Sequence, residues 1–383
     1  MPMKELSECR ILIVDDVKAN VDILVAALRG EYKLSIALDG ESALRNVERN
    51  PPDLVLLDIV MPGIDGYEVC RRIRASETTR EIPVMFLSAL EDVRDKARGF
   101  ELGANDYLTK PFEILEVKAR VRSLLKAKAY ADAVREAMER DLSIAREIQM
   151  GILPSDLSLC TRGTGLDIHA MIEPAKQVGG DLYDVLRVGD DRVVVTIGDV
   201  SGKGIPAALF MAVTITLVRT MARQYKQPDE ILQHLNSELV AQNPQGMFVT
   251  IACLVFDVPT GRVTAASAGH NPLVILRPHQ APQFVFSSSG AMAGLFPTLD
   301  IACESIVLAP NDTVVLYTDG VTEAFNHNRE AFGDERLLES LGHTGQNAAD
   351  TVRGLIGAVR NHAAGAPQSD DITVVAVRYA PGQ

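Results

Sequence analysis

Acidic residues follow short apolar runs in the first 125 residues, at positions where they could share one site. Asp15 and Asp16 come directly after ILIV at 11–14, and Asp58 comes directly after LVLL at 54–57. Three converging carboxylates repel one another unless a divalent cation lies between them, and an oxygen site with open water positions suits Mg²⁺. With the cation bound, one carboxylate can attack a phosphoryl group while the metal neutralises the developing charge. The pattern predicts a phosphoryl-transfer site.

A hydroxyl and an ammonium group complete the set. Ser88 follows the run VMFL at 84–87, and Lys110 stands just before Pro111. Both side chains would hold phosphoryl oxygens. A single Asp-Asp pair is more often a solvated turn, whereas polar residues after four separate apolar runs are a specific signal.

The elements that position these residues alternate between two kinds. Short apolar runs predict buried strands at 11–14, 34–37, 54–57, 84–87 and the stretch before Lys110. Helical spacing of apolar residues occurs between them, at 21–28, 41–48, 67–74 and 93–102. Strand and helix in alternation predict an α/β domain, a five-stranded doubly wound parallel sheet with helices on both faces, at residues 9–125. In such a sheet the functional residues lie at the carboxyl ends of the strands.

This region resembles the receiver domain of two-component response regulators through the motifs VDDVKAN, LLDIVMPGIDGYE, FLSALED and GANDYLTKPF. The resemblance implies that Asp58 accepts a phosphoryl group from a sensor histidine kinase or a phosphotransfer protein. It also implies that Ser88 and Tyr107 form a switch pair, in which the aromatic ring rotates inward. The Mg²⁺ ligands that it implies are Asp15, Asp16, Asp58 and the backbone carbonyl of Val60. A receiver-like fold that is never phosphorylated is the alternative.

Aspartates beside glycines recur in the second half of the chain. They occur in GGDLYD, GDVSGKG, YTDGVTEAF and SDDITVV, and the residues concerned are Asp181, Asp199, Asp319, Asp370 and Asp371. Each adjoins a β-type run, so a sheet margin can project it into a shared site. Carboxylates without a nearby His pair or thiolate pair favour Mg²⁺ or Mn²⁺ over Zn²⁺. Two such ions can activate a water and clamp a phosphoryl group for in-line displacement.

The pattern of apolar and β-branched runs in residues 154–383 is typical of an α+β domain. Alternating or β-branched runs occur at 166–171, 192–197, 249–256, 263–266, 273–276, 314–317 and 372–377, with helical segments at 205–225 and 229–242. Many strands with few helices between them predict antiparallel sheets, here a β-sandwich flanked by helices.

This half resembles the PPM/PP2C-type serine/threonine phosphatases, in particular their SpoIIE/RsbU-like branch, through the motifs above together with DLSIAREIQMGILP and SAGHNP. The resemblance implies two Mn²⁺ or Mg²⁺ ions. Asp199 would bridge both, and the carbonyl of Val200 would complete one of them. Asp319 and Asp370 would hold the second ion. Asp181 would bind metal directly or through water, and Asp184 would lie behind Asp181. Lys203 would meet the substrate phosphate or be a solvated turn residue, and His270 would orient its turn.

The two halves together predict a response regulator, phosphorylated on Asp58, that controls a metal-dependent phosphoserine/phosphothreonine phosphatase. The resemblance implies a phosphorylated STAS-type anti-sigma-factor antagonist as substrate, within a partner-switching pathway. The alternative is a non-enzymatic module that captures a phosphoprotein under control of the receiver. GGD also suggests a diguanylate cyclase, but Leu182 and Tyr183 stand where that family needs other residues.

Residues 113–153 predict one long helix, about 60 Å at about 1.5 Å per residue. Its apolar stripe is not a clean heptad, which suggests a coiled-coil-like linker through which two chains form a homodimer. The net charge of −13 argues against nucleic-acid binding, and the five scattered cysteines are typical of reduced thiols. The uncharged apolar run at 205–218 is better explained as a buried helix than as a membrane span. We therefore expect a soluble, cytoplasmic protein.

Overall fold

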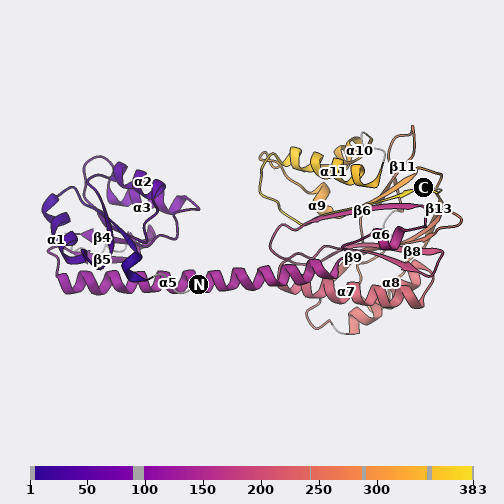
Figure 1. The fold of residues 1–383 in the computed structure, drawn as a ribbon, viewed down its shortest axis with the longest axis horizontal. Coiled ribbons are helices and arrows are strands. Elements are labelled where there is room, and N and C mark those ends of the chain that lie inside the picture. The colour runs from indigo at the N-terminus through magenta and orange to yellow at the C-terminus, as the bar shows by residue number, and fades with distance from the viewer. Residues whose placement is uncertain (1–4, 89–98, 242, 287–289, 343–346, 382–383) are drawn as a thin grey trace. The chain divides into compact units, whose positions relative to one another are not determined.

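The computed structural model describes residues 5–88, 99–241, 243–286, 290–342 and 347–381. The chain divides into two compact units, Met1–Arg140 and Asp141–Gln383 (Figure 1). Each unit has hydrophobic cores of its own.

The first unit is a five-stranded parallel sheet in the order β2-β1-β3-β4-β5. Its strands are β1 (Arg10–Val14), β2 (Lys33–Ala37), β3 (Leu54–Asp58), β4 (Val84–Ser88) and β5 (Asp106–Thr109), and its short helices are α1 (Lys18–Leu28), α2 (Gly40–Arg49) and α3 (Gly66–Ala75). The doubly wound parallel sheet predicted from the sequence is confirmed. Most of the helix predicted at 93–102 lies outside the described residues.

Alternation of side chains along β1 builds a core on each face of this sheet. Leu12 and Val14 join a cluster with residues of α2 and α3, whereas Ile11 and Ile13 join a cluster with residues of α1 and the start of α5. Both faces are therefore buried, which is why the strands read as uninterrupted apolar runs.

The second unit contains two five-stranded antiparallel sheets, in the orders β13-β10-β9-β8-β7 and β12-β11-β14-β15-β6. The first is built from β7 (Leu182–Val188), β8 (Arg192–Val200), β9 (Val249–Asp257), β10 (Arg262–Ala268) and β13 (Glu304–Val307). The second is built from β6 (Leu166–Glu173), β11 (Leu273–Leu276), β12 (Gln283–Val285), β14 (Thr313–Tyr317) and β15 (Ile372–Tyr379). Leu316 faces a core shared by both sheets, while its neighbour Val315 faces a second core.

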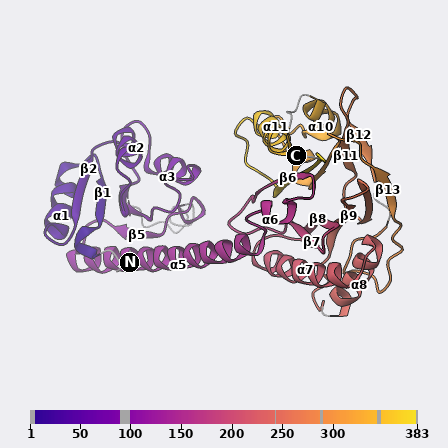
Figure 2. The ribbon, with the colours of Figure 1, turned by 45° about the vertical axis from the view of Figure 1, so that its right-hand side comes forward.

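Helices cover the outer faces of this sandwich (Figure 2). Helices α7 (Ile205–Gln224) and α8 (Pro228–Ala241) pack against the first sheet, and α10 (Gly333–Gly342) and α11 (Ala348–Ala363) pack against the second. Helix α7 is long and apolar enough to cross a membrane by composition, but its buried side belongs to the core of this unit. The predicted antiparallel β-sandwich flanked by helices is confirmed.

Several elements were not predicted from the sequence. They are β7, β12, β13, α10, α11 and two helices of four residues, α6 (Ser158–Thr161) and α9 (Asp319–Thr322). Strands β12 and β13 are short and mostly exposed, so they lack the apolar signature of the other strands.

Helix α5 (Ile114–Ile152) is a single helix of 39 residues, and the expected long helix is therefore present. Its early turns bury Val117 and Val121 in the first unit, and its later turns bury Gln149 in the second. Between them Val134 and Met138 are 50% and 60% exposed.

Candidate functional site

The first site lies at the carboxyl ends of β1 and β3. Ligand oxygens of Asp15, Asp16 and Asp58 all lie within 4.8 Å of one another. The Nζ atom of Lys110, just after β5, is 2.8 Å from a carboxylate oxygen of Asp15 and 2.8 Å from one of Asp58. The Asn20 amide donates to both oxygens of Asp15 and fixes its orientation. The structure thus brings together the residues that the sequence pattern placed at one sheet edge.

Asp58 is adapted to be a nucleophile beside a cation. Burial raises the pKa of Asp58, and its hydrogen bond and charge interaction with Lys110 offset part of that rise. The ammonium group of Lys110 cannot by itself neutralise three carboxylates, so a divalent cation would balance the remaining negative charge. An all-oxygen donor set suits Mg²⁺. These residues fit the ion that the resemblance implies.

Of the expected switch pair, Ser88 lies at this edge, whereas Tyr107 lies further back in the sheet, in register with Phe86. Ser88 ends β4 and is buried, and Tyr107 on β5 is buried with its ring centroid 5.4 Å from that of Phe86 and 5.1 Å from that of Phe100. The Tyr107 ring therefore lies inward in this structure. The side chain of Val60 is exposed and leaves its backbone as the part of the residue available to the site.

In the second unit, Asp181 joins the two sheets. It stands directly before β7, in the first sheet, and its Oδ2 accepts hydrogen bonds from Thr318 Oγ1 (2.8 Å) and Thr373 Oγ1 (2.5 Å), which belong to the β14 and β15 side. The residue is 1% exposed. Burial and the nearby charge of Asp199 raise the pKa of Asp181 well above its ordinary value.

Three further carboxylates belong to the same cluster. Asp199 interacts with Asp181, and Asp319 and Asp370 interact with Asp199. Asp199 lies near the end of β8 and shares a hydrogen bond with Asp181. Burial, followed by the charges of Asp319, Asp370 and Asp371, raises the pKa of Asp199 to about 7. Asp319 begins α9, and Asp370 lies two residues before β15. Within the part of the chain that the structure describes, no three of these carboxylates approach one another as closely as those of Asp15, Asp16 and Asp58.

The chemistry of this set fits divalent cations. Burial and the mutual repulsion of the carboxylates raise the pKa values of Asp181 and Asp199, so their protonated forms are favoured without a counter-charge. A cation would replace those protons, and oxygen-only donors favour Mg²⁺ or Mn²⁺. A Cβ atom on Gly180 would lie 2.6 Å from the carbonyl oxygen of Val200, so only glycine lets this loop approach the predicted carbonyl ligand.

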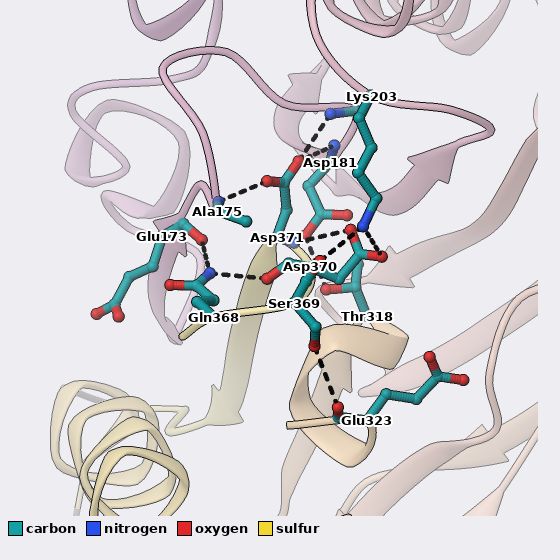
Figure 3. A network of polar contacts seen from close by, with 11 residues as sticks. Glu173, Ala175, Asp181, Lys203, Thr318, Glu323, Gln368, Ser369, Asp370 and Asp371 are labelled. Carbon is teal, nitrogen blue, oxygen red and sulfur yellow. Dashed lines mark hydrogen bonds and ion pairs between the residues drawn. The ribbon is translucent and has the colours of Figure 1, made fainter. Parts of the chain in front are cut away.

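Lys203 is engaged with the acidic cluster. Its Nζ donates to Asp370 Oδ2 at 2.7 Å and to the Ser369 carbonyl at 2.6 Å (Figure 3). Lys203 is also an exposed residue of the loop between β8 and α7, so the solvated turn position expected as one of its two roles is compatible with this contact. Its ammonium group partly neutralises Asp370, at the margin where a phosphate would enter.

Asp371 is a functional residue that sequence reasoning did not assign. Its carboxylate accepts from the backbone N–H of Ala175 (2.8 Å) and of Gly180 (2.8 Å), 196 and 191 residues away in sequence. A Cβ atom on Gly179 would lie 1.9 Å from the same carboxylate. Asp371 therefore holds the loop that carries Asp181. The doublet in SDDITVV was its only sequence signal.

Gln149 near the end of α5 holds the same loop from the other side. Its Nε2 donates to the carbonyl of Gly179 at 2.7 Å, and its Oε1 accepts from the N–H of Gly179 at 3.2 Å. The side chain is 6% exposed. One amide thus satisfies both backbone groups of a single residue. Gln149 lies within the motif DLSIAREIQMGILP, but nothing in that motif assigned it a contact with this loop.

Arg219 on α7 fixes the end of α5 and the residue behind Asp181. Its guanidinium donates to both oxygens of the buried Asp184, each at 2.8 Å, and also to the Ile152 carbonyl at 2.9 Å. Bidentate pairing of this kind fixes geometry as well as charge. This pairing ties Asp184, three residues after Asp181, to α7.

His270 is a structural residue in this arrangement. It is fully buried, and burial lowers its pKa to about 4, so its ring is neutral at physiological pH. Nε2 lies 3.1 Å from the Tyr317 carbonyl and donates to it, which leaves Nδ1 to accept from Thr250 Oγ1, also at 3.1 Å. The ring orients the chain just before Thr318 and Asp319, whereas the turn that it was expected to orient is bonded through the His270 backbone to Ser267.

Comparison with known proteins identifies both halves. The model of the response regulator receiver domain matches residues 11–122, and the model of stage II sporulation protein E (SpoIIE) matches residues 189–380, half of the chain. Protein IcfG of Synechocystis is 28% identical over 88% of this chain and 56% of its own length. Response regulator PleD of Caulobacter vibrioides is 48% identical over 33% of this chain and 28% of its own length. The chain thus spans about half or less of these curated relatives.

Solved structures show the fold of the second unit. The SiaA-PP2C domain of Pseudomonas aeruginosa has a TM-score of 0.58 at 21% identity, covering 64% of this chain and 99% of that one. The PP2C phosphatase domain of SpoIIE from Bacillus subtilis, with a fragment of its regulatory domain, has a TM-score of 0.51 at 22% identity, covering 56% and 61%. The chain belongs to the SpoIIE family and carries a response regulator receiver domain.

Proposed function

We propose that phosphorylation of Asp58 controls a metal-dependent phosphoserine/phosphothreonine protein phosphatase in the second unit. The observation that carries this proposal is the meeting of Asp181, Asp199, Asp319 and Asp370 at one margin of the sandwich, where burial and the neighbouring carboxylates raise the pKa of Asp199. Such a cluster is unfavourable without cations, and its presence at one margin supports cation-dependent chemistry.

In the receiver, a carboxylate oxygen of Asp58 would attack the phosphorus atom of a phosphohistidine on a sensor kinase or phosphotransfer protein. The P–N bond breaks as an acyl phosphate forms. Lys110 is already 2.8 Å from Asp58 and can follow the charge onto the phosphoryl oxygens. The buried hydroxyl of Ser88 is placed to do the same, with Mg²⁺ held by Asp15, Asp16, Asp58 and the Val60 carbonyl.

In the phosphatase, divalent ions bound by Asp199, the Val200 carbonyl, Asp319 and Asp370, with Asp181 direct or through water, would supply an activated water and a positive field for the phosphoryl oxygens. The protein groups keep these ligands in place. Thr318 and Thr373 orient Asp181, and Asp371 holds its loop. The water oxygen bonds to phosphorus, the serine or threonine oxygen leaves and takes a proton, and inorganic phosphate is released.

The substrate class is a proposal from family resemblance. A small STAS-type anti-sigma-factor antagonist, phosphorylated on serine or threonine, would be dephosphorylated within a partner-switching pathway. Lys203 beside Asp370 supports a phosphorylated substrate, because its ammonium lies at the margin of the acidic cluster.

Helix α5 is proposed to transmit the signal between the two sites as part of a homodimer. With 3.6 residues per turn, Gln149 lies on the same face as Ala131, Met138, Leu142 and Ala145, which precede it by 18, 11, 7 and 4 residues. A second chain paired along the exposed part of this face would set the rotation of the helix and hence the presentation of Gln149 to Gly179. Light scattering that gives a monomer with and without phosphodonor would exclude this pairing.

The phosphatase is tested by Mn²⁺-dependent hydrolysis of p-nitrophenyl phosphate by the purified chain. Asp199→Asn should abolish hydrolysis while Asp58 is still phosphorylated by a small phosphodonor. Asp58→Ala should keep basal hydrolysis and lose its response to the phosphodonor. Absence of hydrolysis in the wild-type chain in both phosphorylation states would favour the non-enzymatic binding module.

A further inference from the structure

A cavity of about 260 Å³ opens beside the acidic cluster, on the side of α9 and α11. Gly320 and Ser369 line it, and these residues directly follow Asp319 and directly precede Asp370. Consecutive Cα atoms are about 3.8 Å apart, so the cavity begins one residue from two of the carboxylates. The proposed phosphoryl chemistry makes no use of it.

The walls of this cavity are mainly apolar. They are formed by Ala324, Phe325, Val359, Ala363 and Ile372. Phe325 closes the motif YTDGVTEAF and is 42% exposed, so part of its ring is open to solvent at the cavity. An apolar hollow with an exposed aromatic edge favours an apolar group in contact with it.

The polar side chains at its edge are already engaged. Gln368 Nε2 donates to the Glu173 carbonyl at 2.8 Å and to the Asp370 carbonyl at 2.7 Å, and the Arg360 guanidinium pairs with the Glu173 carboxylate. Figure 3 shows Gln368 between Glu173 and Asp370, next to Ser369. These groups shape the rim between the cavity and the carboxylates. Because the hydrogen-bonding groups at the rim are already paired, the cavity suits an apolar ligand better than a polar one.

We propose that this cavity binds one large apolar side chain of the phosphoprotein substrate, within four residues of the phosphorylated residue. The proposal rests on the proposed phosphatase activity. A phosphoryl group held by the divalent ion that Asp319 and Asp370 would bind places the flanking residues of an extended segment at steps of about 3.3–3.6 Å. The cavity is large enough for one side chain such as Leu, Met or Phe and too small for a helix. Because the cavity adjoins the chain segments that carry Asp319 and Asp370, its occupant is a segment of the substrate and not a second copy of the chain.

The test is a set of phosphothreonine peptides in which each position from four before to four after the phosphothreonine carries Leu, Ala or Lys in turn. With Mn²⁺, the wild-type chain should prefer Leu over Ala at one of these positions by about tenfold to a hundredfold in kcat/KM, the range for one apolar group in a pocket. The preference should appear mainly in KM, because the pocket contacts the flanking side chain and not the bond that breaks.

Two variants locate the pocket. Ala363→Phe fills the cavity and Phe325→Ala removes one wall, so each should reduce the Leu preference to about threefold or less. Phe284→Ala is the matched control, because Phe284 on β12 is 39% exposed and lies outside the cavity. All three should hydrolyse p-nitrophenyl phosphate as the wild type does, since that molecule carries no flanking side chain. Phe325 lies at the surface, so its variant stays informative if Ala363→Phe fails to fold.

The outcomes separate the two proposals. A wild-type chain that hydrolyses p-nitrophenyl phosphate but shows no Leu preference at any position would overturn the pocket alone. A Leu preference that survives in Phe325→Ala with normal p-nitrophenyl phosphate turnover would overturn it as well. A wild-type chain without turnover of either substrate would instead overturn the proposed phosphatase.

Discussion

Replacement of Gln149 by Met removes the contact between α5 and the loop that carries Asp181. Methionine is unbranched and fills a similar volume, but it can neither donate to the Gly179 carbonyl nor effectively accept from the Gly179 N–H. The substitution therefore eliminates the 2.7 Å and 3.2 Å hydrogen bonds of a buried amide. A buried backbone group left without a partner costs about 1–3 kcal/mol, so two of them cost about 2–6 kcal/mol. That cost falls on the second unit.

Urea unfolding in metal-free buffer measures this loss. We expect the free energy of unfolding of the second unit to fall by about 2–6 kcal/mol, with an unchanged dependence on denaturant. Glu147→Met is the matched control, because it places the same side chain two residues earlier at an exposed position of α5. A loss within about 0.5 kcal/mol of that control would contradict the assignment of both bonds.

Activity gives the second readout for Gln149→Met. If α5 acts on the phosphatase through Gly179, p-nitrophenyl phosphate hydrolysis in this variant should respond little to a phosphodonor, while Asp58 is phosphorylated at the wild-type rate. Glu147→Met should keep the wild-type response. A full response in Gln149→Met would refute this route of transmission.

Further predictions concern the support of the second site. Arg219→Met should cost about 3–5 kcal/mol in thermal or urea unfolding, because it leaves the buried Asp184 carboxylate without its partner; the exposed Arg223→Met should cost much less. Because burial lowers the pKa of His270 from 6.5 to about 4, its contribution to stability is fully present above pH 6.5 and is lost as pH falls from there towards 4. That loss amounts to about 3 kcal/mol, and a His270→Asn chain with an equally steep loss over this window would refute the assignment. Mn²⁺ should raise the Tm of the wild-type second unit more than that of Asp199→Asn. Insertion of one alanine after Met138 rotates the preceding part of α5 by about 100° relative to Gln149, so it should abolish the phosphodonor response, whereas an insertion of seven residues should preserve much of it.

The receiver fold and the positions of its acidic residues could be predicted because the determinants are local. Each strand buried on both faces reads as an apolar run, and each functional residue follows such a run directly. Parallel strands then bring Asp15, Asp58 and Ser88 to one edge without further information. Roles such as the acceptor function of Asp58 came from resemblance and stay predictions.

Other features depend on partners that are remote in sequence. Asp371 meets Ala175 across 196 residues, and Gln149 meets Gly179 across 30. Neither residue differs in type from many exposed neighbours, so composition and spacing could not distinguish them. Strand β7 was missed because its first residues belong to GGDLYD and were considered only as part of a site motif. Helices α10 and α11 are amphipathic, but their apolar faces became meaningful only with the sheet that they cover.

The energy of the Gln149 contact bears on how α5 could regulate the second site. A coupling of about 1–3 kcal/mol corresponds to a change of about 5–150-fold between two states. The two bonds to Gly179, worth about 2–6 kcal/mol when broken without replacement, exceed that requirement, so partial loss of the contact would suffice. A slide of α5 by one residue moves Gln149 by about 1.5 Å, and a turn by one residue rotates it by about 100°. Either motion breaks a 2.7 Å hydrogen bond. Small changes in the pairing of α5 could therefore reach Asp181 without any contact between a partner chain and the acidic cluster.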